Sequence, residues 1–227
     1  MDTKIWTDES DNYTKRAQDI NSDMFCLKNS EQHSKNIKEI IDRYTTLTEN
    51  FLDVGCAFGR SINALKEIYK DSYFYGIDPG TETIDLAREN IDSERVFFIN
   101  GFSHDLPYED DKFDVVIFSM VLQWLPRKYL IRTIAEVDRV LKTGGVVYIQ
   151  DFLPNKPITS QSRHDNEIYI FKNDYSSFFT AFSWYKEVYR DIRSIEDGED
   201  QQRVTSIVKK YPLDEVYTLK DGAVEKK

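Results

Sequence analysis

The sequence predicts a doubly wound α/β fold, in which helices cover both faces of a mostly parallel sheet. Between residues 30 and 151, short apolar runs alternate with stretches whose apolar residues recur at helical spacing. Turns that contain glycine or proline separate these segments. Strands and helices that alternate with short connections build parallel sheets with right-handed crossovers.

Five buried strands are expected from runs rich in β-branched and aromatic residues, at 51–54, 73–77, 96–99, 113–118 and 146–149. One helix is expected before them, at 30–44. Three more helices between the strands are indicated by apolar faces at helical spacing: Ile62, Leu65 and Ile68; Ile84, Ala87 and Ile91; Leu130, Ile134, Val137 and Leu141. Thr81 is expected to cap the second of these three.

The pattern changes after Asp151. Residues 152–183 contain prolines and an aromatic cluster but no clear strand–helix unit. Residues 184–195 and 203–211 predict two strands around an acidic turn, hence an antiparallel hairpin at the sheet edge. We therefore expect a single domain over 1–213, with a polar tail at 214–227. Its expected parts are a helical cap (1–47), a cofactor-binding core (48–151), a lid or substrate segment (152–183) and the late strands (184–213).

Composition narrows the classes of function. The chain has 227 residues, 40% of them hydrophobic, and a formal net charge of −10, which argues against a nucleic-acid partner. Cys26 and Cys56 form no disulfide framework or zinc-ligand spacing, so no metal is expected. The most apolar stretch, 115–125, is too short to insert in a membrane. Together with a polar N-terminus unlike a signal peptide, this predicts a cytoplasmic protein.

A glycine turn and an acid indicate a cofactor. Gly55 and Gly59 follow the first strand and allow a sharp turn close to a ligand, although a tight turn without a ligand would also use them. Asp78 ends the second strand about twenty residues later, where an acid binds ribose hydroxyls. An acid there could instead complement the dipole of the following helix. The combination favours a cofactor that contains ribose.

The turn distinguishes between two such cofactors. A dinucleotide site needs a glycine where this chain has Ala57, and Asp53 would repel a pyrophosphate. Asp53 would attract a cationic amino-acid group, and S-adenosylmethionine (SAM) carries an ammonium and a sulfonium but no phosphate. A nicotinamide-dependent reductase remains one alternative. A methyltransferase-like subunit without activity is another.

Several motifs resemble those of class I SAM-dependent methyltransferases. They are Leu52-Asp53-Val54-Gly55-Cys56-Ala57-Phe58-Gly59, Tyr75-Gly76-Ile77-Asp78, Gly101 with Leu106-Pro107-Tyr108, Phe113-Asp114-Val115-Val116 and Leu141-Lys142-Thr143-Gly144-Gly145. Val121-Leu122-Gln123-Trp124-Leu125 is similar to the subgroup of trans-aconitate and malonyl-carrier-protein methyltransferases. The resemblance covers residues 48–151 and implies a Rossmann-like, seven-stranded sheet that ends in an antiparallel hairpin.

The resemblance also implies site residues. Asp53 and Gly55 would contact the methionine part of SAM, Asp78 the ribose, and the loop at 101–104 the adenine. The full expected set is Asp53, Gly55, Cys56, Ala57, Gly59, Asp78, Pro79, Phe102, Ser103, Ser119 and Met120. Phe102 stands where the family often has an acid that bonds the adenine amino group. That contact is lost, replaced by stacking, or supplied by His104 or Asp105.

The chemistry sets few demands on catalytic residues. Methyl transfer from a sulfonium is an in-line displacement that needs alignment rather than a protein nucleophile. An alcohol acceptor benefits from a general base, whereas a carboxylate or phosphate oxygen needs none. His164, in the expected lid, is the candidate base, and a solvated loop histidine is the equal alternative.

A small-molecule acceptor is expected, and its contacts would be Tyr13, Gln123, Trp124, Tyr169, Lys172 and Tyr175. Aromatic runs more often form core and lid packing, but an aromatic-walled pocket would suit an acceptor, with Lys172, Arg163 or Arg127 meeting an anionic group. Trp6 and Tyr13 are expected to close over the cofactor or to anchor an arm. The lid weakly resembles those of methyltransferases that modify bacterial surface glycans such as capsule or O-antigen. The expected acceptor is an oxygen of a sugar, a phosphate-type group or a carboxylate; no oligomeric state follows.

Overall fold

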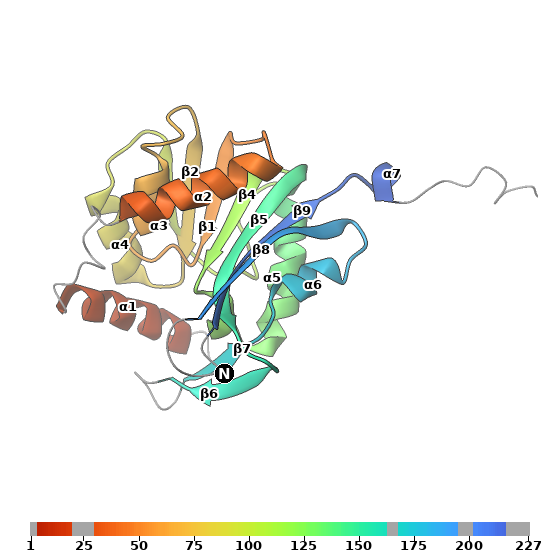
Figure 1. Cartoon of the computed structure of the whole chain (residues 1–227). Helices are drawn as coiled ribbons and strands as arrows, with labels where there is room; N and C mark the ends of the chain where they lie inside the picture. Colours follow the sequence, from red (N-terminus) through yellow and green to blue (C-terminus); the bar gives the residue numbers. More distant parts are fainter. Residues whose placement is uncertain (1–3, 20–29, 163–167, 195–201, 217–227) are drawn as a thin grey trace, which may run out of the picture.

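The structure is a computed structural model of the chain and describes residues 4–19, 30–162, 168–194 and 202–216. One seven-stranded sheet runs through it in the order β3-β2-β1-β4-β5-β9-β8 (Figure 1). Its strands are β1 (Asn50–Val54), β2 (Tyr73–Asp78), β3 (Val96–Asn100), β4 (Phe113–Ser119), β5 (Leu141–Leu153), β8 (Tyr185–Ser194) and β9 (Gln202–Lys210). The first five are parallel, and β9 runs antiparallel to both β5 and β8. This is the predicted sheet with its terminal hairpin.

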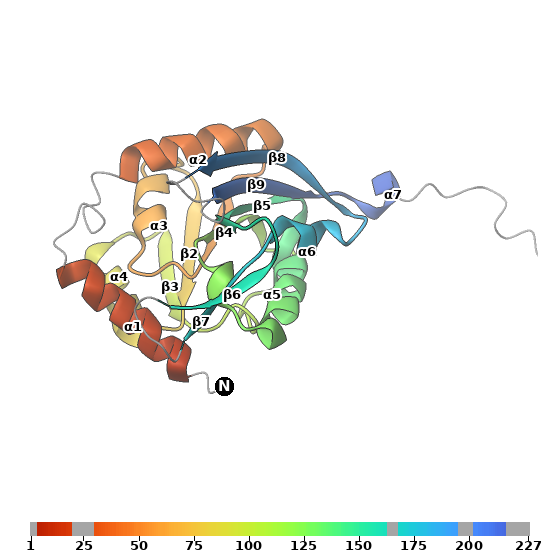
Figure 2. The same cartoon turned by 60° about the horizontal axis from the view of Figure 1, so that its bottom comes forward.

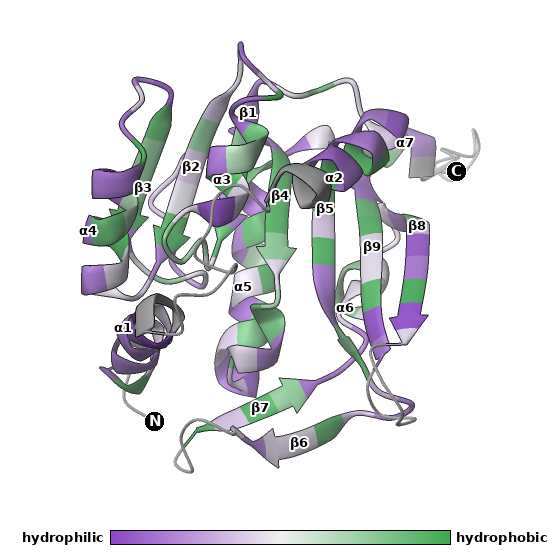
Figure 3. Cartoon of the chain, turned by 60° about the vertical axis from the view of Figure 1, so that its left-hand side comes forward, coloured by the Kyte–Doolittle hydropathy of each residue, from purple (hydrophilic) through white to green (hydrophobic). Residues whose placement is uncertain are grey.

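Helices cover both faces of the sheet, as predicted. The helices are α1 (Lys4–Asp19), α2 (Ser30–Tyr44), α3 (Arg60–Leu65), α4 (Thr81–Asn90), α5 (Arg127–Val140), α6 (Ser176–Thr180) and α7 (Leu213–Val216). Apolar residues of α2, α3 and α4 form one core cluster with the sheet, and those of α5 and α6 form a second on the other face. Figure 3 shows the apolar residues concentrated along the strands between these layers.

Two elements lie beyond the carboxyl ends of the parallel strands, where ligands bind in such sheets. One is α1, and the other is a separate two-stranded sheet formed by β6 (Ile158–Gln161) and β7 (Tyr169–Lys172). Figures 1 and 2 show both at the same end of the molecule. Residues 152–183 were expected to be irregular, but they contain regular structure. The strands β6 and β7 pair over four residues each, and α6 follows them.

Three local expectations were wrong. Helix α3 ends at Leu65, so Ile68 lies outside it. Gly80 rather than Thr81 is the N-cap of α4, and the Thr83 amide donates to Asp11 of α1 instead, at 3.0 Å. Leu141, expected on the last of the helices, instead begins β5 opposite Phe113 of β4; residues 142–145 then interrupt the pairing, with Gly144 left-handed at φ 86°, before Val146 pairs with Val115.

Asp114 ties the far edge of the sheet together. Its Oδ2 accepts hydrogen bonds from the amides of Glu49 and Asn50 at 2.9 and 2.7 Å, and its Oδ1 lies 2.9 Å from Lys142 Nζ. One buried side chain of β4 thereby fixes the starts of both neighbouring strands, β1 and β5.

In the described part of the chain, no helix is long and apolar enough to cross a membrane.

We expect Asp114→Ala to lower the free energy of unfolding by about 3 kcal/mol, because two backbone amides and a lysine lose their buried acceptor. Urea denaturation measures the change. Asp110→Ala is the matched control, since Asp110 pairs with Arg139 at the surface and such a pair contributes less than about 1 kcal/mol. Equal losses in the two variants would contradict this role of Asp114.

Candidate cofactor and acceptor site

Four residues with left-handed backbone gather at the carboxyl ends of two adjacent strands. Gly55, Ala57 and Gly59 follow β1, with φ of 72°, 46° and 82°, and Met120 follows β4 with φ of 62°. Non-glycine residues adopt this conformation at an energetic cost and do so mostly at functional sites. The turn is held in place because the amides of Gly55 and Cys56 donate to the Ile77 carbonyl of β2 at 2.8 and 3.2 Å.

The two glycines are required by the protein's own packing. A Cβ on Gly55 would lie 2.5 Å from Val121 Cγ2, and one on Gly59 would lie 2.7 Å from both Ile91 and Phe98. The sequence alone suggested that these glycines make room for a ligand. In the structure they make room for neighbouring side chains, which preforms the turn.

Asp78 ends β2 and faces the turn. Its side chain is 5% exposed; Oδ2 accepts from the Ala57 amide at 3.0 Å, and Oδ1 accepts from the Gly80 amide at 2.9 Å and from the Ser10 hydroxyl of α1. Burial raises the pKa of Asp78, and these hydrogen bonds oppose the increase. The carboxylate therefore joins the glycine turn, the start of α4 and α1 at one point.

Asp53 is the second acid of the site and lacks such support. It is 3% exposed, and the described residues give its carboxylate no hydrogen-bond donor. Burial, and secondly the charge of Asp78, raise the pKa of Asp53 to about 8. A buried acid next to another acid either keeps its proton or attracts a cation. The described residues contain no group of three or more His, Cys, Asp or Glu side chains that could hold a metal ion.

The other side chains predicted at the cofactor are distributed around the turn. Cys56 points into the core, since its Sγ would lie 2.8 Å from a Cβ on Gly76, and burial raises its pKa. The Ser103 hydroxyl pairs with Thr133 of α5 at 2.8 Å, and the Pro79 carbonyl accepts from Asn100 at 2.9 Å. Ser119 is half-buried at the end of β4.

Aromatic rings line up where the resemblance places the adenine. The Phe102 and His104 rings lie 5.4 Å apart, and His104 stacks on Tyr129 at 4.1 Å with an angle of 21° between the ring planes. Burial is the main cause that lowers the pKa of His104. Asp105 is exposed and lies 3.8 Å from Arg132. Of the three alternatives for the missing acid at Phe102, this arrangement favours stacking.

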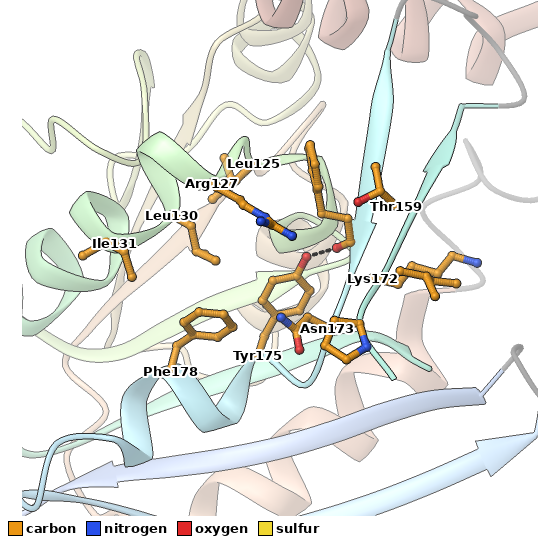
Figure 4. A pocket seen from close by; sticks show the side chains of 12 residues that line it. Leu125, Arg127, Leu130, Ile131, Thr159, Lys172, Asn173, Tyr175 and Phe178 are labelled. Atoms are coloured by element: carbon orange, nitrogen blue, oxygen red, sulfur yellow. Dashed lines mark hydrogen bonds between the residues drawn. The ribbon is translucent and has the colours of Figure 1, made fainter. Parts of the chain in front are cut away.

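A cavity of about 400 Å³ lies between α5 and the β6–β7 hairpin (Figure 4). Its lining is mostly apolar: Leu125, Leu130, Ile131, Pro157, Ile158, Phe171, Tyr175 and Phe178, with Arg127, Thr159, Lys172 and Asn173 as the polar members. Of the six residues expected to contact the acceptor, it brings together Lys172 and Tyr175. Tyr13, Gln123, Trp124 and Tyr169 do not line it.

The polar groups of this cavity differ in direction. Figure 4 shows the Arg127 guanidinium directed toward the cavity, near Tyr175, whose hydroxyl donates to the Phe171 carbonyl. The Lys172 ammonium points away from both and lies 4.4 Å from the centre of the Phe152 ring. Arg127 is thus the cation placed to meet a bound anion.

Two structural contributors were missed by the sequence reasoning. Asp151, at the end of β5, is fully buried, and its carboxylate accepts from the amides of Gln123 at 3.2 Å and Phe152 at 2.8 Å. Burial raises its pKa to about 7. It fixes the short 3₁₀ helix η2 (Leu122–Trp124) beside the turn. Its only sequence signal was an acid at a strand's carboxyl end.

The polar face of α1 is the other missed contributor. Ser10 and Asp11 contact Asp78 and Thr83, and Thr14 pairs with Thr83 at 2.7 Å. Tyr13 is on the same helix, and burial is the main cause that raises its pKa. Helical spacing of small polar residues was the available signal. His164 and Arg163, expected in the lid, lie outside the described residues.

One part of the chain matches a known protein family. Residues 52–149 match the family described as methyltransferase domain, and they contain the glycine turn, Asp53, Asp78 and Met120. The chain is thus similar to methyltransferase domains over 98 of its 227 residues. The predicted Rossmann-like fold is confirmed by the order and direction of the strands.

The relatives that this chain resembles have diverse names. An arsenite methyltransferase of Halobacterium salinarum is 34% identical over 52% of this chain and 30% of its own length. A fatty-acid O-methyltransferase of Mycolicibacterium smegmatis is 30% identical over 49% of this chain and 40% of its own length. The chain therefore matches well under half of the length of these relatives.

A solved structure extends the similarity of fold. Burkholderia thailandensis 1,6-didemethyltoxoflavin-N1-methyltransferase, with bound 1,6-didemethyltoxoflavin and S-adenosylhomocysteine, has a TM-score of 0.66 and is 13% identical. The alignment covers 89% of this chain and 87% of that protein. The shared fold thus reaches beyond residues 52–149.

We expect Asp53→Asn to stabilise the ligand-free protein increasingly from about pH 5 to about pH 8. Unfolded Asp53 ionises near pH 4, whereas the folded carboxyl keeps its proton up to a pKa of about 8. The wild-type free energy of unfolding therefore falls over this interval and levels off above it. In urea denaturation, the advantage of the variant should grow by about 1 kcal/mol or more.

Asp71→Asn, at an exposed turn, is the control and should show no such trend. If the advantage of Asp53→Asn is the same at both ends of the pH range, Asp53 is ionised in the folded protein and the raised pKa is wrong.

Proposed function

We propose that this protein transfers a methyl group from SAM to a small-molecule acceptor. The observation that carries the proposal is Asp53, a buried acid without a donor, placed beside the left-handed turn. Bound SAM supplies an electrophilic methyl group on a positively charged sulfur. Asp53 would then keep its negative charge beside the cationic end of SAM, and binding would release a proton near neutral pH.

Asp78 would bind the ribose. Its Oδ1 accepts from Ser10, so the ribose hydroxyls would share or replace that bond. Phe102, His104 and Tyr129 would form the adenine edge by stacking. The residues of this chain thus orient the cofactor, while α1 and the β6–β7 hairpin exclude water. Alignment of this kind provides much of the acceleration in a displacement reaction.

The cavity beside α5 is the proposed acceptor site. Its walls are largely apolar, which suits an acceptor with an apolar body and leaves few partners for the many hydroxyls of a sugar. Arg127 would bind an anionic group. Among the three expected acceptor types, this lining favours a carboxylate or a phosphate-type group, neither of which needs a general base. A base at His164 is proposed only for a hydroxyl acceptor, as in surface-glycan synthesis.

Two alternatives predict different ligands. A nicotinamide-dependent reductase would need to place a pyrophosphate beside Asp53 and Ala57, where the negative charge of Asp53 would repel it. A methyltransferase-like subunit without activity would bind SAM, or nothing, without turnover. The narrower likeness to trans-aconitate and malonyl-carrier-protein methyltransferases stays a prediction, as do a cytoplasmic location and a single domain over 1–213.

Calorimetry with SAM and its product S-adenosylhomocysteine tests the proposal directly. We expect micromolar binding of both and none of NADH. Asp78→Asn should weaken binding about tenfold or more, because the ribose loses a charged acceptor. Asp85→Asn, on the exposed side of α4 and paired with Arg88, is the control. Absence of binding to the wild type would reject the proposed function.

Methyl transfer from labelled SAM to a panel of carboxylic acids, phosphate esters, sugars and alcohols tests the acceptor. On an anionic acceptor, we expect Arg127→Gln to lower kcat/KM about tenfold, mainly through KM. Arg132→Gln is the control, since Arg132 lies on the same helix but pairs with Asp105. Activity confined to neutral sugars, with no effect of Arg127→Gln, would contradict the anionic acceptor.

A further inference from the structure

Three buried polar atoms without hydrogen-bond partners lie at the junction between α1 and the glycine turn. Among the described residues, four unpaired side-chain atoms are themselves completely enclosed: Trp6 Nε1, Glu9 Oε2, Arg60 Nε and Tyr108 Oη. The first two belong to α1, and Arg60 begins α3 directly after Gly59. Folded proteins rarely leave such atoms unpaired, so these three are candidates for contact with a ligand.

The positions on α1 are consistent with one shared face. Residues 6, 9, 10 and 13 are separated by three or four positions, which places them on one side of a helix. Ser10 bonds Asp78, whose other oxygen accepts from Ala57 in the glycine turn. The charge of Arg60 acts on Tyr13. This side of α1 is therefore linked to the turn through Ser10 and Asp78 and lies within electrostatic range of Arg60 at the start of α3.

The unpaired atoms have complementary chemistry. Trp6 Nε1 and Arg60 Nε are donors, and a donor pair with a positive charge suits a carboxylate. Glu9 Oε2 is an acceptor on a side chain only 6% exposed. The other oxygen of Glu9 already accepts from Arg16 at 2.6 Å, so the group is held in place as a carboxylate that still needs a donor. An ammonium supplies one.

We propose that Trp6, Glu9 and Arg60 form a clamp for the zwitterionic amino-acid end of SAM, with Glu9 at the ammonium and Trp6 and Arg60 at the carboxylate. This inference rests on the proposed function and extends it to two residues of α1, which precedes the matched residues 52–149. Because Glu9 takes the ammonium, Asp53 would face the sulfonium, which is the other positive charge of SAM. The clamp selects the intact amino-acid end over a nucleoside that lacks it.

Two ligands separate the clamp from the rest of the site. S-adenosylhomocysteine carries the amino-acid end, whereas 5′-methylthioadenosine shares the thioether and the nucleoside but lacks it. By calorimetry, Glu9→Gln, Arg60→Gln and Trp6→Phe should each weaken S-adenosylhomocysteine binding about fivefold or more. Binding of 5′-methylthioadenosine should change by less than about twofold.

Glu82→Gln is the matched control. Glu82 pairs with Lys15 of α1 at 2.7 Å, and both side chains are exposed. The substitution Glu82→Gln should therefore leave both affinities unchanged. A second measurement does not depend on variants that keep their fold. The Trp6 indole N–H resonance of the wild type, assigned with Trp6→Phe, should shift on adding S-adenosylhomocysteine and stay in place with 5′-methylthioadenosine.

Three outcomes would overturn the clamp while cofactor binding stands. The wild type would bind both ligands equally, the variants would weaken both equally, or the variants would change neither affinity. The second outcome would make α1 a cover only, and the third would mean that these three side chains do not contact the ligand. If the wild type binds neither ligand, the proposed function itself fails.

Discussion

The site depends on the burial of two carboxylates, Asp53 and Asp78, within reach of each other's charge. Burial raises the pKa of both, which makes the ligand-free site unfavourable for their ionised forms. The two carboxylates differ in the hydrogen bonds that the rest of the structure provides for them. Asp78 receives donors from three segments, and Asp53 receives none from the described residues. The difference suits one acid to fixed hydrogen bonds and the other to a mobile cation.

Helix α1 is part of the same arrangement. Its polar residues reach Asp78 and the start of α4, so the N-terminal segment covers the carboxyl edge of the sheet by hydrogen bonds rather than by an apolar face alone. An interface of this kind holds α1 over the turn and leaves polar atoms available to a ligand. The unpaired atoms of Trp6 and Glu9 on this helix are the ones that we propose bind SAM.

The acceptor side is built differently. The β6–β7 hairpin, α5 and α6 surround a mostly apolar cavity (Figure 4), and Asp151 secures η2 between that cavity and the turn. Packing against Val121 fixes Gly55 from the same side. Short connections from β4 and β5 therefore link the two halves of the site, so that both ligands would meet at the ends of adjacent strands.

The sequence by itself determined the sheet, its hairpin and the acids of the glycine turn, because periodicity, turn residues and motif spacing are local signals. It did not determine that Val121 requires Gly55, that Ser10 bonds Asp78, or that Arg127 rather than Lys172 faces the cavity. Residues 152–183 showed no strand signal, since β6 and β7 are short and need each other. Only the tertiary structure decided these points, because each depends on side chains that are far apart in the chain.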